Sequence, residues 1–293
     1  MIKVLLLGGS GFIGRNILEQ LSSDYQIFAP SSQELNLLDA EEVEKYLSLH
    51  NFDIVIHAAN YGGNRSQAGL VGVFETNKKM FLNLTKNFSA FGRMIFLGSG
   101  AEYDKSRSLM KVKESEFGIF QPKDDYGRVK YFASEQIADM PGAVNLRCFG
   151  VFGKYEDYST RFISNAICRA LSDLPILVRQ NTVFDYWYVN DLVRIIKHFI
   201  ENEPKHKFYN TGTGKGIELA VLAKIIKELT GTKLDIEIKN AEILKEYTCD
   251  NSLLLKELDA FQFTMMSEAV KKMMEWYRQN LSSINKSLLN FDA

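Results

Sequence analysis

The chain has 293 residues, of which 46% are hydrophobic and 24% charged, so it can form one large domain or two modest ones. Lysine and arginine number 35 and aspartate and glutamate 36, and the net charge of −1 excludes a global field that would attract nucleic acid or an anionic membrane. Three widely spaced cysteines, Cys148, Cys168 and Cys249, exclude a disulfide framework and a cysteine metal motif, so we expect free thiols and no metal.

The beginning of the chain and its hydropathy bear on where the protein resides. The first residues lead directly into an apolar strand rather than a signal peptide. No apolar run approaches the ~20 residues of a membrane span. We therefore expect a cytoplasmic protein with neither a membrane nor a nucleic-acid partner.

The first predicted element is an apolar strand over Val4–Leu7, and a glycine-rich turn, GGSGFIG, follows at once. A helix is predicted over Arg15–Leu21. A buried strand, a glycine turn and a helix start in this order form the first unit of a dinucleotide-binding fold. Free N–H groups at such a helix start face a pyrophosphate, where the helix dipole favours negative charge. We expect the cofactor to contact Gly8, Ser10, Gly11, Phe12, Ile13 and Gly14.

The end of the second predicted strand, Tyr25–Ala29, bears on the choice of cofactor. An acid near this point would bind the ribose 2′-OH of NAD, and none stands before Glu34. Ser31 and Ser32 can instead donate hydrogen bonds to a 2′-phosphate. This favours NADP(H), with NAD(H) as the alternative.

Alternating helices and strands continue the pattern. They are expected over 40–50 (helix), 54–56 (strand), 71–90 (helix) and 93–97 (strand). This alternation predicts a parallel sheet with helices on both faces. Ala58 and Ala59, after the third strand, are small enough for a cofactor to lie against their backbone. His57 just before them could be a base, but a histidine in this position is more often buried and hydrogen-bonded, so we favour a structural role.

Three polar residues form a candidate catalytic group. Ser99 follows the fourth strand, and Tyr126 and Lys130 share one face of a helix expected from Asp125 to about Asp139. A nearby ammonium and a positive nicotinamide would lower the pKa of the phenol. Tyr126 could then take a proton from a substrate hydroxyl or give one to a ketone, while Ser99 orients the same oxygen. Lys130 would also hold the nicotinamide ribose.

The glycine turn, the strand-end serine and the Tyr-x-x-x-Lys helix together resemble the extended short-chain dehydrogenase/reductase family of nucleotide-sugar epimerases, dehydratases and reductases. The resemblance covers nearly the whole chain, including the final strand at 209–211 and the helices expected over 217–230 and 267–281. It implies an α/β fold: a Rossmann-type doubly wound parallel sheet with a smaller C-terminal α/β substrate domain. It assigns 1–148 plus 183–210 to the dinucleotide and 149–182 plus 211–293 to the substrate. It also implies that Asn36 and Leu37 hold the adenine and that Asn77 steadies the cofactor site.

The same resemblance implies a nucleotide-diphosphate sugar as substrate. Asn145–Gly153 resembles the crossing to the substrate domain, and Arg161 begins a helix similar to the family's nucleotide-binding segment. Phe184 stands where the family usually has an arginine, so we expect other arginines to meet the diphosphate charge. The expected substrate contacts are Ser99, Gly100, Ala101, Arg147, Arg161 and Arg179. The family also implies a homodimer built from the helices expected over 71–90 and 126–139.

Departures from the family narrow the expected reaction. Ser99, Gly100 and Ala101 stand where 4,6-dehydratases carry Thr-Asp-Glu, and Glu102 comes one place too late, so its side chain should point elsewhere. The 3,5-epimerase/reductases have a cysteine where Ala101 stands. We therefore expect reduction of a nucleotide-linked 4-ketosugar, in polysaccharide biosynthesis. The alternatives are a 4-epimerase with retained NAD and a non-catalytic NADP(H)-sensing protein, which would not need Ser99, Tyr126 and Lys130.

Overall fold

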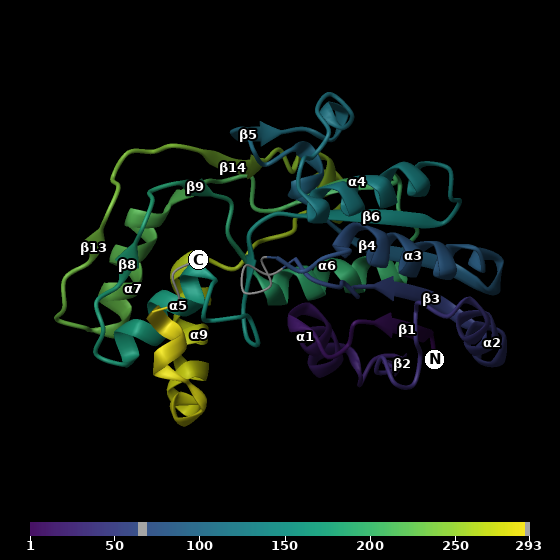
Figure 1. Ribbon diagram of the computed structural model, residues 1–293, viewed down its shortest axis with the longest axis horizontal. Helices are drawn as coiled ribbons and strands as arrows, with labels where there is room; N and C mark the ends of the chain where they lie inside the picture. Colours follow the sequence, from purple (N-terminus) through teal and green to yellow (C-terminus); the bar gives the residue numbers. More distant parts are fainter. Residues whose placement is uncertain (64–68, 291–293) are drawn as a thin grey trace.

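The computed structural model describes residues 1–63 and 69–290, and its larger part is built on a six-stranded parallel sheet (Figure 1). The strand order is β11-β6-β4-β3-β1-β2. The strands are β1 (Lys3–Leu7), β2 (Gln26–Phe28), β3 (Phe52–His57), β4 (Phe91–Ser99), β6 (Ala143–Cys148) and β11 (Phe208–Thr211). Every pairing between them is parallel, which confirms the expected doubly wound sheet.

Helices cover both faces of this sheet because its strands are apolar on both sides. Val4 and Leu6 of β1 pack in the core formed with α1 (Phe12–Leu21) and α6 (Val189–Glu201). Leu5 and Leu7 pack in the opposite core, which contains α2 (Ala40–His50), α3 (Val73–Thr85) and α4 (Asp125–Ala138). The alternation of side chains along β1 thus divides its apolar residues between the two layers.

The smaller part of the molecule holds α5 (Phe162–Leu171), α7 (Leu219–Thr230) and α9 (Met266–Gln279), which share one apolar core (Figure 1). Short strands form small sheets that are separate from the large one. They are β5 (Leu109–Val112), β7 (Val151–Phe152), β8 (Leu177–Val178), β9 (Val183–Phe184), β10 (Trp187–Tyr188), β12 (Ile217–Glu218), β13 (Glu237–Ile238) and β14 (Glu246–Cys249). Short helices complete the chain: η2 (Phe88–Ala90), η3 (Gly100–Tyr103), η4 (Glu114–Glu116), α8 (Ser252–Leu258), η5 (Leu281–Ser283) and η6 (Lys286–Asn290).

Element boundaries differ from the sequence-based expectations at several places; α1, for example, begins at Phe12 rather than at Arg15. The helix expected over 71–90 spans only Val73–Thr85, and a separate turn, η2, follows it. Ile217 and Glu218 form a strand paired with β9, so α7 begins at Leu219 rather than at Ile217. In the last two cases tertiary contacts override a continuous helical pattern.

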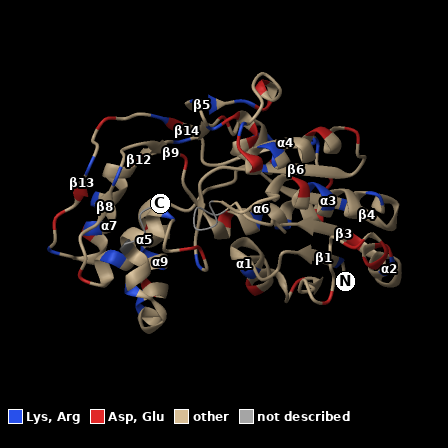
Figure 2. Cartoon of the chain, viewed as in Figure 1, with Lys and Arg blue, Asp and Glu red and all other residues tan. Residues whose placement is uncertain are grey.

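The surface carries both signs of charge, interspersed over both parts of the molecule, with acids prominent along α2 (Figure 2). Within the described residues, no helix combines the length and the apolar character needed to cross a lipid bilayer.

Candidate active site

A cleft of about 1310 Å³ lies at the carboxyl ends of the large sheet's strands and extends to the smaller part of the molecule. Its charged lining is mostly cationic among the described residues. The cations are Lys105, Arg107, Lys130, Arg161, Arg179 and Lys245, and the acids are Glu156 and Glu246. Because the chain as a whole carries a net charge of −1, this local excess of positive charge favours an anionic ligand.

The glycine turn at one end of the cleft fits a dinucleotide pyrophosphate. Gly8 has a φ of +86°, and a Cβ on Gly14 would lie 2.1 Å from the Gly8 carbonyl oxygen, so neither position accepts a larger residue. Gly11 is the N-cap of α1, and no side chain caps that helix. The N–H groups of Phe12 and Ile13 at its first turn lie at the cleft lining and can bind an anion. Ser10 lines the cleft beside them.

The residues expected at the adenosine end, Ser31, Ser32, Asn36, Leu37, Ala58 and Ala59, also line the cleft. The Glu34 carboxylate accepts a hydrogen bond from the Ser31 N–H at 2.8 Å. Hydrogen bonds from Ser31 lower the pKa of Glu34. Glu34, the first acid after β2, is not part of the lining and is directed at its own loop, whereas Ser32 lines the cleft.

Ser99, Tyr126 and Lys130 come together in the same cleft. Tyr126 lies in the first turn of α4, whose N-cap Asp124 accepts a hydrogen bond from Gly127. The Lys130 Nζ donates to the Leu97 carbonyl at 2.8 Å and lies 5.8 Å from the centre of the Tyr126 ring. Burial lowers the pKa of Lys130 to about 8, against the opposing charge of Glu102. The structure therefore brings the expected catalytic group together.

The pKa of Tyr126 differs from the expectation of an acidified phenol. Burial raises it, and this outweighs both the hydrogen bond from Ser99 and the positive charge of Arg161. The Lys130 ammonium lies beside the ring and is hydrogen-bonded to a backbone carbonyl rather than to the phenol oxygen. Tyr126 is therefore protonated at neutral pH in the protein without ligands.

A loop after β3 packs over Tyr126. A Cβ on Gly63 would lie 2.7 Å from the Tyr126 ring. Asn77 of α3 holds this loop, because its Oδ1 accepts from the Tyr61 N–H at 2.8 Å and its Nδ2 donates to the Tyr61 carbonyl at 2.7 Å. Asn77 does not line the large cleft, so any effect that it has on a cofactor is indirect, through the loop that it holds.

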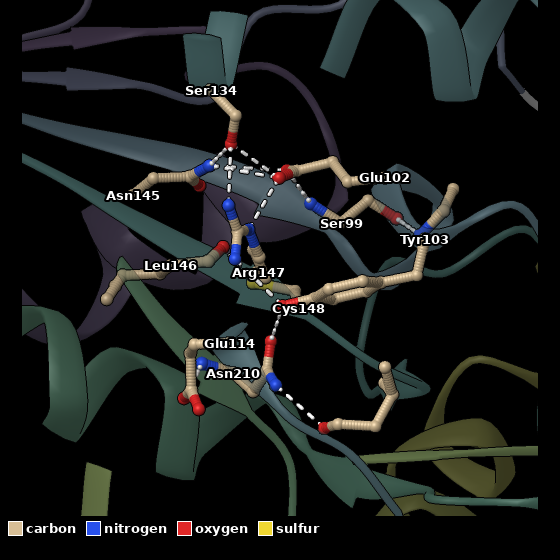
Figure 3. Close-up of polar contacts among 12 residues, drawn as sticks. Ser99, Glu102, Tyr103, Glu114, Ser134, Asn145, Leu146, Arg147, Cys148 and Asn210 are labelled. Atoms are coloured by element: carbon tan, nitrogen blue, oxygen red, sulfur yellow. Dashed lines mark hydrogen bonds and ion pairs between the residues drawn. The ribbon is translucent and has the colours of Figure 1, made fainter. Parts of the chain in front are cut away.

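A buried polar cluster lies behind Ser99. Figure 3 shows Ser134, Asn145 and Arg147 converging on the Glu102 carboxylate. The Arg147 Nε lies 2.7 Å from the Glu102 Oε2, and the side chains are 1% and 0% exposed. Arg147 is outside the cleft lining, which corrects its expected contact with the diphosphate. Glu102 points away from the cleft, as expected from its position.

Gly100 is also placed differently from the expectation. It is buried, and a Cβ there would lie 2.5 Å from the Tyr247 hydroxyl. Ala101 lines the cleft and Gly100 does not, so Gly100 makes room for Tyr247 rather than for a ligand. Tyr247 itself lines the cleft, and the Ser99 hydroxyl lowers its pKa, although burial raises it further.

Sequence reasoning missed Tyr247, which the pairing of β14 with β5 brings to the site from far along the chain. It also missed Glu156, a cleft acid in the smaller part of the molecule. The Ser164 hydroxyl lies 2.5 Å from the Glu156 carboxylate, and burial raises the pKa of Glu156 to about 7, although Arg161 opposes the shift. Arg161 and Arg179 line the cleft as expected.

Two further residues near the site are His57, which lies outside the cleft lining, and Cys148, which is part of it. His57 is 3% exposed, and burial lowers its pKa to about 3. Its expected hydrogen bonds are missing, because neither ring nitrogen has a partner among the described residues. Cys148 lines the cleft, and burial raises the pKa of its thiol to about 11. In the described part of the chain, no group of three His, Cys, Asp or Glu side chains could hold a metal ion.

Comparisons with known proteins support the fold described above. The model of the NAD dependent epimerase/dehydratase family matches residues 4–212. GDP-L-colitose synthase of Yersinia pseudotuberculosis is 24% identical over 256 residues, covering 79% of this chain and 83% of that protein.

Two solved structures show the same fold. UDP-glucose 4-epimerase of Thermotoga maritima, crystallised with UDP-glucose, has a TM-score of 0.83 at 24% identity and covers 96% of this chain and 100% of its own. GDP-L-fucose synthetase of Naegleria fowleri, bound to NADP, has a TM-score of 0.82 at 14% identity. The match covers 97% of this chain and 95% of that one. At these identities the similarity establishes the fold.

Proposed function

The chain belongs to the NAD-dependent epimerase/dehydratase family, and from that premise we propose that it reduces a nucleotide-linked 4-ketosugar with NADPH. The substrate class is supported by the relatives, which include GDP-L-colitose synthase and a UDP-glucose 4-epimerase structure containing UDP-glucose. The cationic lining of the cleft suits two diphosphate-bearing ligands.

The residues of the cleft have separate roles in this reaction. A bound NADPH would supply the hydride to the ketone carbon. Tyr126 gives its phenolic proton to the ketone oxygen, so that the O–H bond of Tyr126 breaks and the carbinol O–H forms. Ser99 donates a hydrogen bond that orients the same oxygen, and the Lys130 ammonium offsets the charge left on the phenolate and holds the nicotinamide ribose.

One observation carries the proposal: Ser99, Tyr126 and Lys130 meet at the end of β4, and η3 presents no acid to the cleft. The neighbouring Glu102 is paired with Arg147 and buried. Elimination of water would need an additional acid and base beside Tyr126. Cys148 lacks that capacity because its raised pKa keeps it a thiol. Tyr126 carries its phenolic proton at neutral pH, because burial raises its pKa, and this proton is available for transfer to a ketone oxygen.

NADP(H) is proposed over NAD(H) because Ser32 faces the cleft and Glu34 does not. We propose that residues 1–148 plus 183–210 bind this cofactor and that 149–182 plus 211–293 bind the sugar nucleotide. Arg161 and Arg179 are the proposed partners of the substrate diphosphate, and Ser99 and Ala101 of the sugar.

We also propose a homodimer formed through α3 and α4. Phe74 and Phe132 on these helices are only partly buried, and the cations Lys78 and Arg128 lie over Phe74. A monomeric sedimentation profile at micromolar concentration would contradict the dimer.

A 4-epimerase is the second candidate, favoured by the structural similarity to UDP-glucose 4-epimerase. The two reactions use the same residues but treat the cofactor differently. An epimerase regenerates its cofactor in each turnover and therefore retains NAD, whereas a reductase must release NADP after each turnover. NAD that stays with the purified protein through dialysis would favour the epimerase.

The direct test is a single-turnover assay with NADPH and nucleotide-linked 4-ketosugars. We expect loss of the reduced-nicotinamide absorbance and one new carbinol per NADPH, identified by NMR. Interconversion of two 4-epimers without net oxidation of NADPH would show that the protein is an epimerase rather than a reductase. Tight NADPH binding without any turnover would overturn both the reductase and the epimerase proposals and would support a non-catalytic NADP(H)-sensing protein.

A further inference from the structure

Lys130 lines two spaces in the protein. The first is the large cleft, where Lys130 lies next to Tyr126. The second is a small cavity of about 10 Å³, which is close to the space that one water molecule needs. The walls of this small cavity are His57, Ala59, Asn60, Asn77, Phe81, Phe96, Val129, Lys130 and Ala133.

The Lys130 ammonium group needs more than one hydrogen-bond acceptor. It has three N–H donors, and the residue is only 6% exposed, so an unmatched donor would be costly. One N–H donates to the Leu97 carbonyl at 2.8 Å. In the proposed function a second donor serves a ribose hydroxyl in the cleft. This leaves a third donor for the small cavity.

His57 is the acceptor that this cavity offers. Its two ring nitrogens are buried and have no hydrogen-bond partner among the described residues. Asn77, by contrast, uses its amide on Tyr61 and on the Val73 carbonyl. Burial and the charge of Lys130 lower the pKa of His57 to about 3, so the imidazole is neutral and one ring nitrogen keeps a free lone pair.

We propose that one ordered water fills the small cavity, accepts a hydrogen bond from the Lys130 ammonium and donates one to a ring nitrogen of His57. His57 then acts as a positioning residue, holding Lys130 through this water without touching substrate or cofactor. The cavity wall is largely apolar, but its size and its two polar partners, the Lys130 ammonium and the His57 imidazole, meet the conditions under which one buried water is stable. The water site stands apart from the proposed function, and only its effect on turnover rests on that function.

Other titratable groups near Lys130 influence its pKa or lie beside its ammonium group. Glu102 on η3 and Cys148 on β6 raise the pKa of Lys130, while burial lowers it. Tyr126 on the same helix lies with its ring 5.8 Å from the ammonium. None of these three residues lines the small cavity that His57 shares with Lys130.

The test uses His57→Phe, His57→Gln and the control His206→Gln, which changes an exposed histidine outside both cavities. The titration of Lys130 is followed by NMR of carbon-labelled lysine in the cofactor-free protein. Loss of a hydrogen bond to a charged group should lower the pKa of Lys130 by about one to two pH units in His57→Phe. His57→Gln keeps an amide acceptor and should stay close to the wild type. A titration in His57→Phe that matches the wild type would overturn the proposal.

A high-resolution crystal structure of the wild-type protein tests directly whether the water is present, and this test does not depend on whether His57→Phe folds. We expect density within hydrogen-bond distance of both the Lys130 Nζ and a His57 nitrogen, and a dry cavity would refute the proposal. In the turnover assay the basic limb of the pH profile of kcat should move to lower pH in His57→Phe. Because the NMR and crystal readouts need no substrate, their result is independent of whether the protein is a reductase.

Discussion

Glu102 and Arg147 form an ion pair in the interior of the protein, with 2.7 Å between the Arg147 Nε and the Glu102 Oε2. The other Glu102 oxygen accepts a hydrogen bond from the Ser99 N–H at 3.0 Å. The pair therefore joins β6 to η3 and fixes the backbone of the strand-end serine. Its function is to support the site from behind the cleft.

Breaking this pair should destabilise the protein strongly. Arg147→Met leaves the Glu102 carboxylate buried without its cation, and the expected loss is about 3–5 kcal/mol in the free energy of unfolding. The double variant Arg147→Met/Glu102→Leu removes both charges and should recover much of that loss. Urea unfolding measures both, and equal destabilisation of the single and double variants would show that the charge itself is unimportant.

Tyr126→Phe should remove the proton donor and keep the packing of the ring against Gly63. We expect kcat to fall by about 10²–10⁴-fold, with NADPH affinity nearly unchanged. The matched control is Tyr131→Phe, because Tyr131 lies on the same helix, is buried and is absent from the cleft lining. Retention of wild-type kcat in Tyr126→Phe would disprove the assigned role.

Ser32→Asp should change the preference between cofactors. A carboxylate there repels the 2′-phosphate of NADPH and can accept a hydrogen bond from the ribose 2′-OH of NADH. A charge-assisted hydrogen bond of this kind corresponds to roughly a tenfold change or more in the ratio of kcat/KM values. Ser48→Asp, at an exposed position of α2, serves as the control. An unaltered preference would place the 2′-phosphate elsewhere.

Glu156 predicts a pH dependence of stability. Its pKa rises from 4.5 in the unfolded chain to about 7 in the folded protein, so the folded protein binds the proton more tightly. The stability that this proton contributes is fully present below the unfolded pKa and is lost as the pH rises through the folded pKa. The expected loss between about pH 5 and about pH 8 is about 3 kcal/mol.

Glu156→Gln should not show that loss, because the amide does not titrate. Relative to the wild type, the variant should therefore gain stability as the pH rises. Urea midpoints at both pH values measure the difference. Parallel pH dependence of the variant and the wild type would mean that Glu156 is not the titrating group.

The parts of the site that the sequence predicted correctly are local in the chain. The glycine turn determines its own geometry between β1 and α1, and Tyr126 and Lys130 share a helix face by their spacing alone. The alternation of apolar strands and helices was sufficient to predict the parallel sheet, because its central strands are buried on both faces.

The contacts that were missed depend on partners distant in the chain. Arg147 and Cys148 are adjacent, but successive side chains on a strand point to opposite faces, so Cys148 reaches the cleft and Arg147 reaches Glu102. The strand period could have indicated this difference, but not the choice of Glu102 as partner. Tyr247 enters the site through the pairing of β14 with β5, which no local pattern indicates.

The most direct test of the central claim is a crystal structure with NADP and a nucleotide-linked sugar bound together. The account predicts the pyrophosphate at the N–H groups of Phe12 and Ile13, with the nicotinamide C4 about 3–3.5 Å from the reacting sugar carbon. The Tyr126 hydroxyl should lie within hydrogen-bond distance of the oxygen on that carbon. A pyrophosphate bound away from the glycine turn, or a Tyr126 hydroxyl directed away from the sugar, would contradict the account.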